Sequence, residues 1–366
     1  MTSVEWGEFR IGDLFEIQNT LSFNKDLLTE GREYDYITRT SQNQGILQET
    51  GFVNEENINS AGNWSLGLLQ MDLFYREKPW YAGQFVRKIT PKIYLSRNSI
   101  LYFTVVLNKQ KQSLLSVLVR DVDKKFLSTK IKLPILNDGS INYDFMDSFI
   151  SELEQERVVE LKAYLSITGL DNYLLTDEEQ VVLGRFEKGD IVFSGFPYKS
   201  IFNNIKQGRR LKKDDQLQGD IPFVMAGTTN TGVVNYISNP VALFPSNSIT
   251  VDIFGNSFYR SYDFGAGDDT GVYWSNNRIY AKETMLFLTT AVAKSLYGKF
   301  DFGNKLRSSQ SLDFVMQLPS NNEQPDFTLM NTLISAIQKL VIKDVVLYAN
   351  REIEATKIAV DRKSCI

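Results

Sequence analysis

Positive charge is concentrated at one place in a sequence that is otherwise mildly acidic. Residues 206–215 read KQGRRLKKDD, which puts five basic side chains into eight residues of a chain with a formal net charge of −4 at pH 7. Exposed arginine and lysine can contact phosphates, and such contacts position a protein on DNA without specifying sequence. The alternative is a solvated loop, but no acid compensates the run before Asp214. The basic run (residues 206–213) is therefore a candidate phosphate-binding segment.

Two polar turns carry side chains that can read bases. The first amide loop (Thr38–Gly45, TRTSQNQG) and the second amide loop (Ala226–Gly232, AGTTNTG) each follow an apolar, strand-like run. Arg, Asn and Gln can make two hydrogen bonds to one base edge, and the Thr methyl group can add an apolar contact. The Asn-x-Gly spacing also suits a hairpin turn, so both roles stay open. FGNKLRSSQS at 302–311 is a further candidate phosphate-contact loop.

Two other patterns could belong to an enzyme. Asp147 with Glu160 and Lys162 matches the loose D…E-x-K spacing of nucleases, but these residues lie on a predicted helix and that motif normally sits on strands. DFGAGDD at 263–269 lacks the strand–GxGxxG–helix context of a cofactor loop, and a tight hairpin fits it better. The chain has no histidine, and its only cysteine is Cys365. This composition removes His- and Cys-based catalysis and most transition-metal sites, so we expect neither catalysis nor a metal here.

The sequence predicts two long amphipathic helices, one between two strand-rich regions and one after the second region. Residues 144–165 carry one apolar stripe, and residues 324–360 carry another at spacings of three and four. Strand-like runs include GDLFEI, YDYITRT, GLLQMDLFY and SILYFTVVL, and strands are expected to resume at VVLGRFEKGDIVF. A further helix is expected at 284–297.

The order of these elements repeats. Four pairs of echoes keep their order at a nearly constant offset: FRIGDL with FEKGDI (9–14 and 186–191), YITRTSQNQGI with FVMAGTTNTGV, LFYR with SFYR, and Leu133-Pro134 with Leu318-Pro319. A period this long predicts two tandem domains. If the long helices pair antiparallel, a helix of about 22 residues is about 33 Å long, close to one turn of B-DNA. The alternative is that the helices only pack the domains together.

The predicted fold class is α+β, with two tandem β-rich domains separated by long antiparallel spacer helices in a pseudo-twofold internal repeat. We expect domains at 1–140 and 173–322 and spacer helices at 141–172 and 323–366. The N-terminus lacks the basic and apolar regions of a secretion signal, and no apolar run approaches the roughly 20 residues of a membrane helix. We therefore expect a cytoplasmic protein.

The longest motifs resemble one family. FNNIKQGRRLKKDDQLQGDIPFVMAGTTNTGVVNYISNP, FPSNSITVDIFGNSFYRSYDFGAGDDTGVYW and GKFDFGNKLRSSQS resemble the target-recognition domain of specificity (S) subunits of restriction–modification systems, of the BcgI-like type IIB group and its type I relatives. The first half, with EWGEFRIGDLFEI and KPWYAGQ, resembles a first recognition domain more loosely. The resemblance implies that each domain reads half of an interrupted double-stranded DNA target.

The resemblance also implies which parts are missing from this chain. S-adenosylmethionine-dependent methyl transfer and Mg²⁺-dependent cleavage would belong to methyltransferase and restriction subunits, which dock largely on the helices. Because the first domain has no basic run, its phosphate contacts would come from dispersed residues. The open alternatives are a stand-alone two-domain ligand-binding or scaffold protein, and a self-contained nuclease or methyltransferase.

The candidate site residues follow from the loops, the basic segments and the helical stripes. The candidate DNA-binding residues are Thr38, Arg39, Gln42, Asn43, Gln44, Arg87, Lys88, Lys206, Arg209, Arg210, Lys212, Lys213, Thr228, Thr229, Asn230, Lys305, Arg307 and Ser308. The candidate partner-binding residues are Met146, Phe149, Leu153, Leu161, Ile334, Ile337 and Val341.

Overall fold

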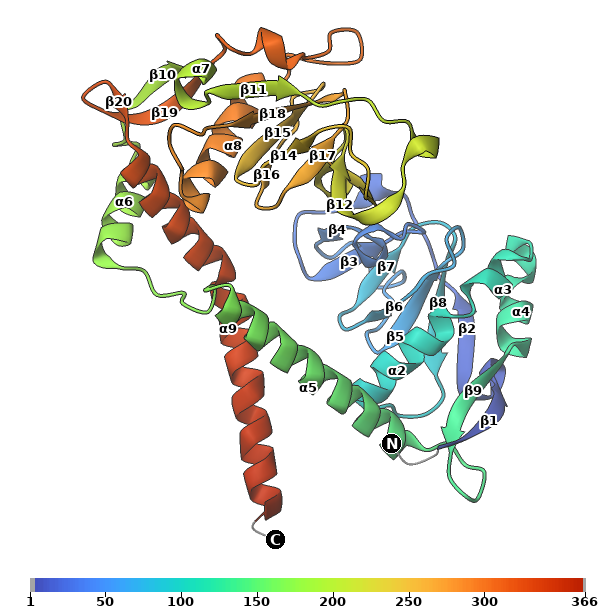
Figure 1. Ribbon diagram of the computed structural model, residues 1–366. Helices are drawn as coiled ribbons and strands as arrows, with labels where there is room; N and C mark the ends of the chain where they lie inside the picture. The colour runs from blue at the N-terminus through green and yellow to red at the C-terminus, as the bar shows by residue number, and fades with distance from the viewer. Residues whose placement is uncertain (1–3, 365–366) are drawn as a thin grey trace. The chain divides into compact units, whose positions relative to one another are not determined.

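The computed structural model describes the backbone of residues 4–364 and the side chains of residues 4–355 (Figure 1). Two compact units divide the chain: one runs to Glu160 and includes the last helix from Glu352, and the other is Leu161–Arg351. No helix in the described part of the chain is long and apolar enough to cross a membrane. The predicted α+β class is confirmed by the mixture of helices and mainly antiparallel sheets.

The first half of the chain (β1 to β9) contains three sheets. One sheet pairs β1 (Glu5–Arg10) with β9 (Lys130–Ile135). A four-stranded antiparallel sheet has the order β2 (Phe15–Asn19), β8 (Val86–Pro91), β5 (Asn63–Gly67), β6 (Leu73–Arg76). The third sheet has the order β4 (Ile46–Thr50), β3 (Tyr34–Ile37), β7 (Trp80–Ala82), with β3 and β7 parallel.

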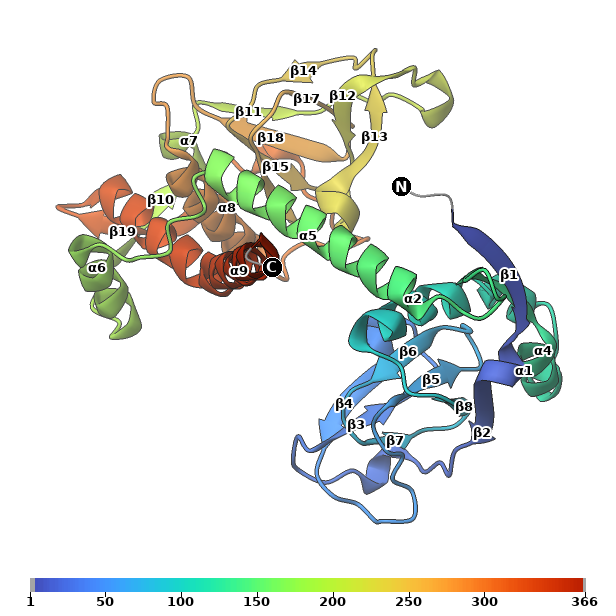
Figure 2. The same ribbon diagram turned by 90° about the horizontal axis from the view of Figure 1, so that it is seen from below.

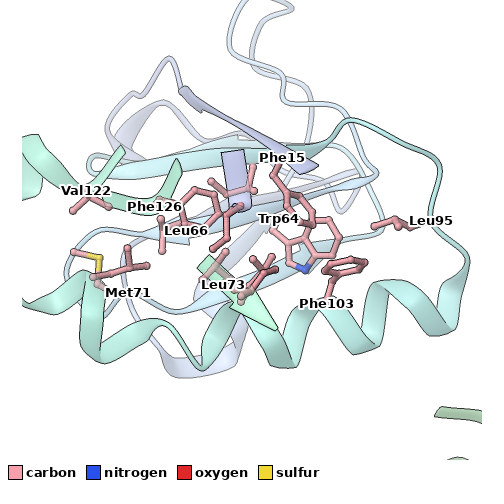
Figure 3. Close-up of a cluster of buried hydrophobic side chains, with 14 of the residues drawn as sticks. Phe15, Trp64, Leu66, Met71, Leu73, Leu95, Phe103, Val122 and Phe126 are labelled. Carbon is pink, nitrogen blue, oxygen red and sulfur yellow. The ribbon is translucent and has the colours of Figure 1, made fainter. Parts of the chain in front are cut away.

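The core of this half lies on the four-stranded sheet (Figure 3). Trp64 packs edge-on against Phe15 with 5.7 Å between ring centroids, and Phe15 packs in the same way on Phe103. The indole N–H of Trp64 donates to Thr104 at 2.7 Å, so this buried polar group is satisfied. The helices of this half are α1 (Ile11–Leu14), α2 (Arg97–Asn108), α3 (Lys111–Leu115) and α4 (Val122–Ser128).

The strand expected at SILYFTVVL is wrong, because this segment lies within α2. Ser96 caps the helix by accepting a hydrogen bond from the backbone N–H of Ser99 at 3.0 Å. Phe103 and Leu107, four residues apart, are both buried on one helix face. Packing of this face outweighs the strand preference of the neighbouring valines.

The second half (β10 to β20) repeats this sheet plan. One sheet has the order β10 (Phe193–Pro197), β19 (Val315–Asn321), β20 (Gln324–Pro325). The four-stranded sheet has the order β11 (Asn204–Gln207), β18 (Thr270–Trp274), β15 (Ser248–Asp252), β16 (Ser257–Arg260). The next sheet has the order β13 (Val233–Ile237), β12 (Gln218–Val224), β17 (Phe264–Ala266), β14 (Leu243–Phe244). Short helix α7 (Tyr198–Ile201) and helix α8 (Lys282–Leu296) complete this half, and α8 confirms the helix expected at 284–297.

Three of the four sequence echoes fall at equivalent places, which confirms the internal repeat. The amide loops join β3 to β4 and β12 to β13, LFYR is β6 where SFYR is β16, and the two Leu-Pro pairs lie on β9 and β19. The fourth echo is wrong. Trp6 pairs with Pro134 as Phe193 pairs with Pro319, so 9–14 corresponds to 196–201 and not to 186–191.

Residues 186–191 instead cover the end of a helix, α6 (Asp177–Glu187), and the turn that follows it. A strand was expected here. Thr176 accepts from the backbone N–H of Glu179 at 3.2 Å, and the Glu179 carboxylate accepts from the backbone N–H of Thr176 at 2.8 Å. This capping box starts the helix, and Gly189 at φ 74° follows its end. The T-x-x-E pattern was readable in the sequence.

The two long helices are α5 (Tyr143–Ile167) and α9 (Phe327–Ser364). Within the second unit, the end of α5 packs on α9 through Leu165, Val346 and Ala349. Val341, on the apolar stripe predicted for this helix, is 75% exposed and takes no part in the contact with α5. The sequence of α9 has apolar residues on several faces of the helix, so more than one set of residues spaced three or four apart could form the buried stripe. Figures 1 and 2 show α6 beside the first turns of α9.

Candidate nucleic-acid interface

Both amide loops have the same unusual backbone. Asn43 and Gln44 have φ of 45° and 54°, and Asn230 and Thr231 have φ of 46° and 52°. Two consecutive left-handed residues are costly for side chains other than glycine, and asparagine tolerates them best. Each Asn side-chain amide donates to the backbone carbonyl three residues on, at 3.2 Å for Asn43 and 3.3 Å for Asn230. The asparagines therefore build the turn, and the second hydrogen on each amide nitrogen is not used by this bond.

A glycine closes each loop. Gly45 has φ +80° and Gly232 has φ +85°, a region that L side chains rarely adopt. A Cβ on Gly232 would lie 2.7 Å from the carbonyl oxygen of Met225. The loop ends meet through backbone bonds, Thr38 N–H to Gly45 O at 2.8 Å and Met225 N–H to Gly232 O at 2.9 Å.

A buried arginine holds the backbone of each loop by a hydrogen bond. Arg76 on β6 is 3% exposed, and its Nη2 donates to the backbone carbonyl of Gln44. Arg260 on β16 is 1% exposed, and its Nη2 donates to the backbone carbonyl of Thr231. The carbonyl in each case belongs to the second left-handed residue of the loop. The four-stranded sheet of each half is thereby tied to the loop of the neighbouring sheet.

Neutral oxygen atoms surround both guanidinium groups. The Nε of Arg76 donates to the Ser65 hydroxyl at 2.9 Å, and the Nε of Arg260 donates to the Thr250 hydroxyl at 3.0 Å. Burial lowers the pKa of Arg76 to about 10, against the opposing effect of Asp35, and burial also lowers the pKa of Arg260. Asp35 itself pairs with Lys78 at 2.9 Å. Arg76 therefore stays protonated at neutral pH without a direct carboxylate partner of its own.

A hollow lies beside each amide loop. In the second half, it has a volume of about 770 Å³, and its lining includes Arg210, Lys212, Lys213 and Asp268, together with Met225 at the start of the loop. In the first half, a hollow of about 560 Å³ lies at the same place in the repeat. Its lining includes Lys25, Asp26, Thr38, Arg39 and Gln84.

The other two basic residues of the basic run and Arg307 line a separate hollow of about 670 Å³. Lys206, Arg209 and Arg307 contribute to its wall, and the Lys206 ammonium lies 5.5 Å from the centre of the Trp274 ring. The backbone of the basic run is held at Gly208 and Arg209, whose N–H groups donate to the carbonyls of Thr270 and Ala266, both at 2.8 Å. The chain passes so close there that a Cβ on Gly208 would lie 2.1 Å from the carbonyl oxygen of Gly267. The run is therefore fixed at its middle and divides its charges between two hollows.

The predicted DNA-binding residues differ in how accessible they are to a ligand. The side chains of the two amide loops and the basic run are exposed or half-buried on their own halves. Ser308 is an error of prediction, because it is buried and its backbone N–H donates to Gln207 at 2.9 Å. Arg87 pairs with Asp123 at 3.0 Å, which neutralises its charge, and Lys88 beside it lies within β8. Lys305 is exposed and lies over the Phe302 ring at 4.7 Å.

The predicted partner-binding residues include both buried and exposed side chains. Met146 is an error, because it is fully buried in the first core. Phe149 and Leu153 are 37% and 38% exposed on α5. Ile334 and Ile337 line an apolar hollow of about 640 Å³ that also includes side chains of α6 and α8. Leu161 packs partly buried against the α5–α9 contact, and Val341 is exposed.

The residues of the nuclease-like pattern do not converge. Asp147 accepts hydrogen bonds from Ser96 and Ser99, while Glu160 pairs with Arg157 at 2.6 Å. Asp147 and Glu160 lie on one helix, where about 1.5 Å per residue puts them roughly 20 Å apart. Residues 263–269 contain β17, which pairs with β12 and β14 and not with β18, so the expected hairpin is also wrong.

Sequence reasoning missed the two loop-holding arginines. Their strands were recognised as an echo, LFYR and SFYR, but the arginine at the end of each was given no role. The signal available was a charged residue at the same place in both copies of a repeat, at the end of an otherwise apolar strand. Lys25 was also missed, because it is a single charge in a polar segment.

The protein has two β-rich halves, and a long helix follows each of them. Each half presents an amide loop that a buried arginine holds beside a hollow. This duplicated arrangement defines a recognition protein with two similar domains. The family described as the type I restriction modification DNA specificity domain matches residues 3–163 and 196–346, and the chain belongs to this family. Such specificity subunits are the non-catalytic components of restriction–modification systems; they recognise the DNA target and assemble with the other subunits.

Two known proteins illustrate the relationship. The specificity subunit of the type II restriction enzyme BcgI from Heyndrickxia coagulans is 25% identical over 349 residues, which covers 93% of this chain and 96% of the relative. The S subunit of a type I restriction–modification system from M. genitalium has a similar fold, with a TM-score of 0.59 at 15% identity, over 99% of this chain and 96% of the other.

Proposed function

We propose that each half of this protein reads one half of an interrupted double-stranded DNA target. Residues 1–140 and 173–322 are the proposed recognition domains, and 141–172 and 323–366 are the proposed spacer helices. The observation that carries the proposal is the duplicated arrangement of an amide loop, a buried arginine and a hollow beside the loop. Two copies of one recognition surface suit a target with two separate parts.

The proposed readers are the exposed side chains of the two loops. Gln42, Gln44, Thr228 and Thr229 are exposed, and glutamine can bond adenine in two places while threonine can contact the methyl group of thymine. Phosphate contacts come from the second half above all, since Lys206, Arg209 and Arg307 line one of its hollows and Arg210, Lys212 and Lys213 line the one beside the amide loop. In the first half, Lys25 and Arg39 take this role.

The proposed partner-binding residues are exposed apolar side chains on each long helix, Phe149 and Leu153 on α5 and, separately, Val341 on α9. The partners are a methyltransferase subunit and, where the system cleaves, a restriction subunit. S-adenosylmethionine and Mg²⁺ would be held by those partners. A protein that directs modification of chromosomal DNA works in the cytoplasm, where that DNA lies.

The test is co-expression with the neighbouring methyltransferase gene, followed by mapping of methylated bases in the host genome. The expected result is a single interrupted motif whose two specific parts lie about one helical turn apart, since α5 has 25 residues and is about 37 Å long. Absence of any complex with the methyltransferase would favour the scaffold alternative. Methylation by the purified chain alone would contradict the division of labour.

A further inference from the structure

We propose that Arg76 and Arg260 are positioning residues for sequence readout, each fixing the selectivity of the half of the target that its own amide loop contacts. This inference rests on the proposed function. It adds two residues that touch no DNA and act through the loop backbone.

The first argument is the shape of the contact. Each arginine is the last residue of its strand, β6 or β16, and reaches out of the four-stranded sheet to the loop of the neighbouring sheet. A hydroxyl on the adjacent strand, Ser65 or Thr250, fixes the Nε end of the guanidinium. Because the guanidinium is planar and rigid, a fixed Nε end also fixes the Nη2 that holds the loop carbonyl.

The second argument is the cost of this arrangement. Burying a guanidinium against neutral acceptors costs free energy that an apolar side chain of similar volume would not. Three of the four residues at the loop tips differ, Ser41-Gln42-Asn43-Gln44 in one and Thr228-Thr229-Asn230-Thr231 in the other, and only the turn-building asparagine is shared. The arginine and its acceptor atom are nevertheless the same in both. The constant part of the site is the support, and the variable part is the set of side chains that it holds.

The third argument concerns which peptide is held. The carbonyl belongs to Gln44 or Thr231, whose positive φ places it in a backbone state that L residues leave readily. Rotation of the peptide that follows would turn the neighbouring loop side chains away from a common direction. The arginine hydrogen bond opposes this rotation, so it keeps the loop in one conformation before DNA binds, and preorganised contacts discriminate best.

The two supports differ in strength. Arg260 makes two further bonds through Nη1, to the Thr231 hydroxyl at 3.0 Å and to the Tyr262 hydroxyl at 3.2 Å. Arg76 relies on Ser65 and the loop carbonyl. The loss of Arg260 is therefore expected to relax selectivity more than the loss of Arg76.

The experiment uses the full chain in complex with its methyltransferase. Arg76→Met, Arg76→Lys, Arg260→Met and Arg260→Lys are compared with the wild type on DNA in which every target position is substituted singly. For each Met variant we expect discrimination to fall about tenfold or more at positions of one half-site and to stay unchanged at the other. The affected half differs between the two arginines. The Lys variants keep the charge but lose the two-point geometry, so they recover only part of the discrimination.

Controls separate positioning from general stability. Arg120→Met removes an exposed arginine of the first half that pairs with Asp121, and it should leave both half-sites unchanged. Ser65→Ala removes the hydroxyl that accepts from Nε and Nη2 of Arg76 but keeps the arginine, and it serves if Arg76→Met does not fold. A lower melting temperature with intact discrimination, or equal loss in both half-sites, overturns the inference. If the wild-type complex discriminates at neither half-site, the proposed function itself fails and this inference fails with it.

Discussion

The hollow beside the amide loop has corresponding walls in the two halves of the molecule but a different charge. In the second half, three basic residues and one carboxylate line it: Arg210, Lys212, Lys213 and Asp268. In the first half, the corresponding segment supplies Lys25 and Asp26, whose charges cancel, and Arg39 comes from the loop itself. The loop backbone is the same in both halves to within a few degrees of φ. Duplication has therefore kept the geometry of readout while the electrostatics diverged, which shows that the two properties can change independently.

The long helices show a second difference between the halves. Asn142 and Asp326 cap α5 and α9 in the same way, each accepting from the backbone N–H three residues on at 2.9 Å. With the helices aligned on these caps, Phe149 and Leu153 correspond to Leu333 and Ile337. In the second half α6 packs on this row, whereas Phe149 and Leu153 are exposed. The same helical face is thus a core contact in one half and an open apolar surface in the other.

The largest expected effect comes from placing the same charge at these two equivalent positions. Ile337→Asp should destabilise the second half by about 3 kcal/mol, because it replaces an apolar side chain that packs against the buried cluster between α6 and α9 with a carboxylate. Leu153→Asp should change stability by no more than about 0.5 kcal/mol and should instead prevent assembly with the methyltransferase. Thermal unfolding and co-purification measure the two outcomes. A Leu153→Asp chain that assembles like the wild type would remove this face from the proposed partner surface.

The next effect concerns the charge difference between the hollows. Replacing Arg210, Lys212 and Lys213 together with alanine should weaken binding to every DNA sequence by roughly 100-fold at 0.15 M salt. If each side chain contacts one phosphate, the slope of log affinity against log salt should fall by about 2.7. The matched change in the first half, Lys25→Ala with Arg39→Ala, should lower the slope by less than 2. Loss confined to the cognate sequence would show that the basic run reads bases.

A smaller and more local effect is expected from the turn asparagines. Asn43→Ala removes the bond to the Ile46 carbonyl and the preference for a left-handed backbone, and Asn230→Ala does the same at Val233. Each change should reduce discrimination by about 1–3 kcal/mol at one half-site only. The measurement is methylation of single-substitution target libraries by the complex. Equal relaxation of both half-sites by either variant would break the assignment of one loop to each half.

The repeat and the loops could be predicted from the sequence because both are local signals. The amide loops show their turn through Asn-x-Gly, and the Leu-Pro pairs mark β9 and β19. The echo at 186–191 failed because Gly189 and Asp190 end a helix there, while the similar Gly12 and Asp13 lie in a one-turn helix between two strands. Short glycine-acid motifs suit several turns, so they do not identify an element without its pairing partner.

The supports of the site could not be predicted, because they depend on contacts between sheets. Nothing local in LFYR indicates that Arg76 reaches a carbonyl 32 residues earlier in the chain. Likewise, Ser308 looked like an exposed hydroxyl in a polar loop, although Gln207 draws it into the interior. Arg87 was expected to contact DNA, but its charge is used by Asp123 on a helix that follows 36 residues later.

The smallest expected effect is a pH dependence that belongs to the second half alone. The Glu179 carboxylate accepts from Lys339 at 2.8 Å and from the Ser335 hydroxyl at 2.6 Å. The corresponding positions of α5 are Ser151 and Gln155, which carry no charge. Despite the opposing effect of burial, these bonds lower the pKa of Glu179 to about 2.

Because the folded-state pKa lies below the ordinary value of 4.5, the interaction stabilises the fold fully above about pH 4.5. The stabilisation is lost as the pH falls from 4.5 towards 2, where the carboxylate becomes protonated in the folded state too. The side chains of Glu179 and Lys339 are only 7% and 16% exposed, so the charge of Glu179 is well shielded from water. Glu179→Gln should therefore cost about 1 kcal/mol at pH 7, because the glutamine amide oxygen can still accept a hydrogen bond but the attraction between opposite charges is lost. The melting temperatures of the wild type and the variant should converge on acidification. A difference that stays constant from pH 7 to pH 3 would mean that Glu179 acts through its capping bonds to α6, which the glutamine can partly keep, and not through its charge.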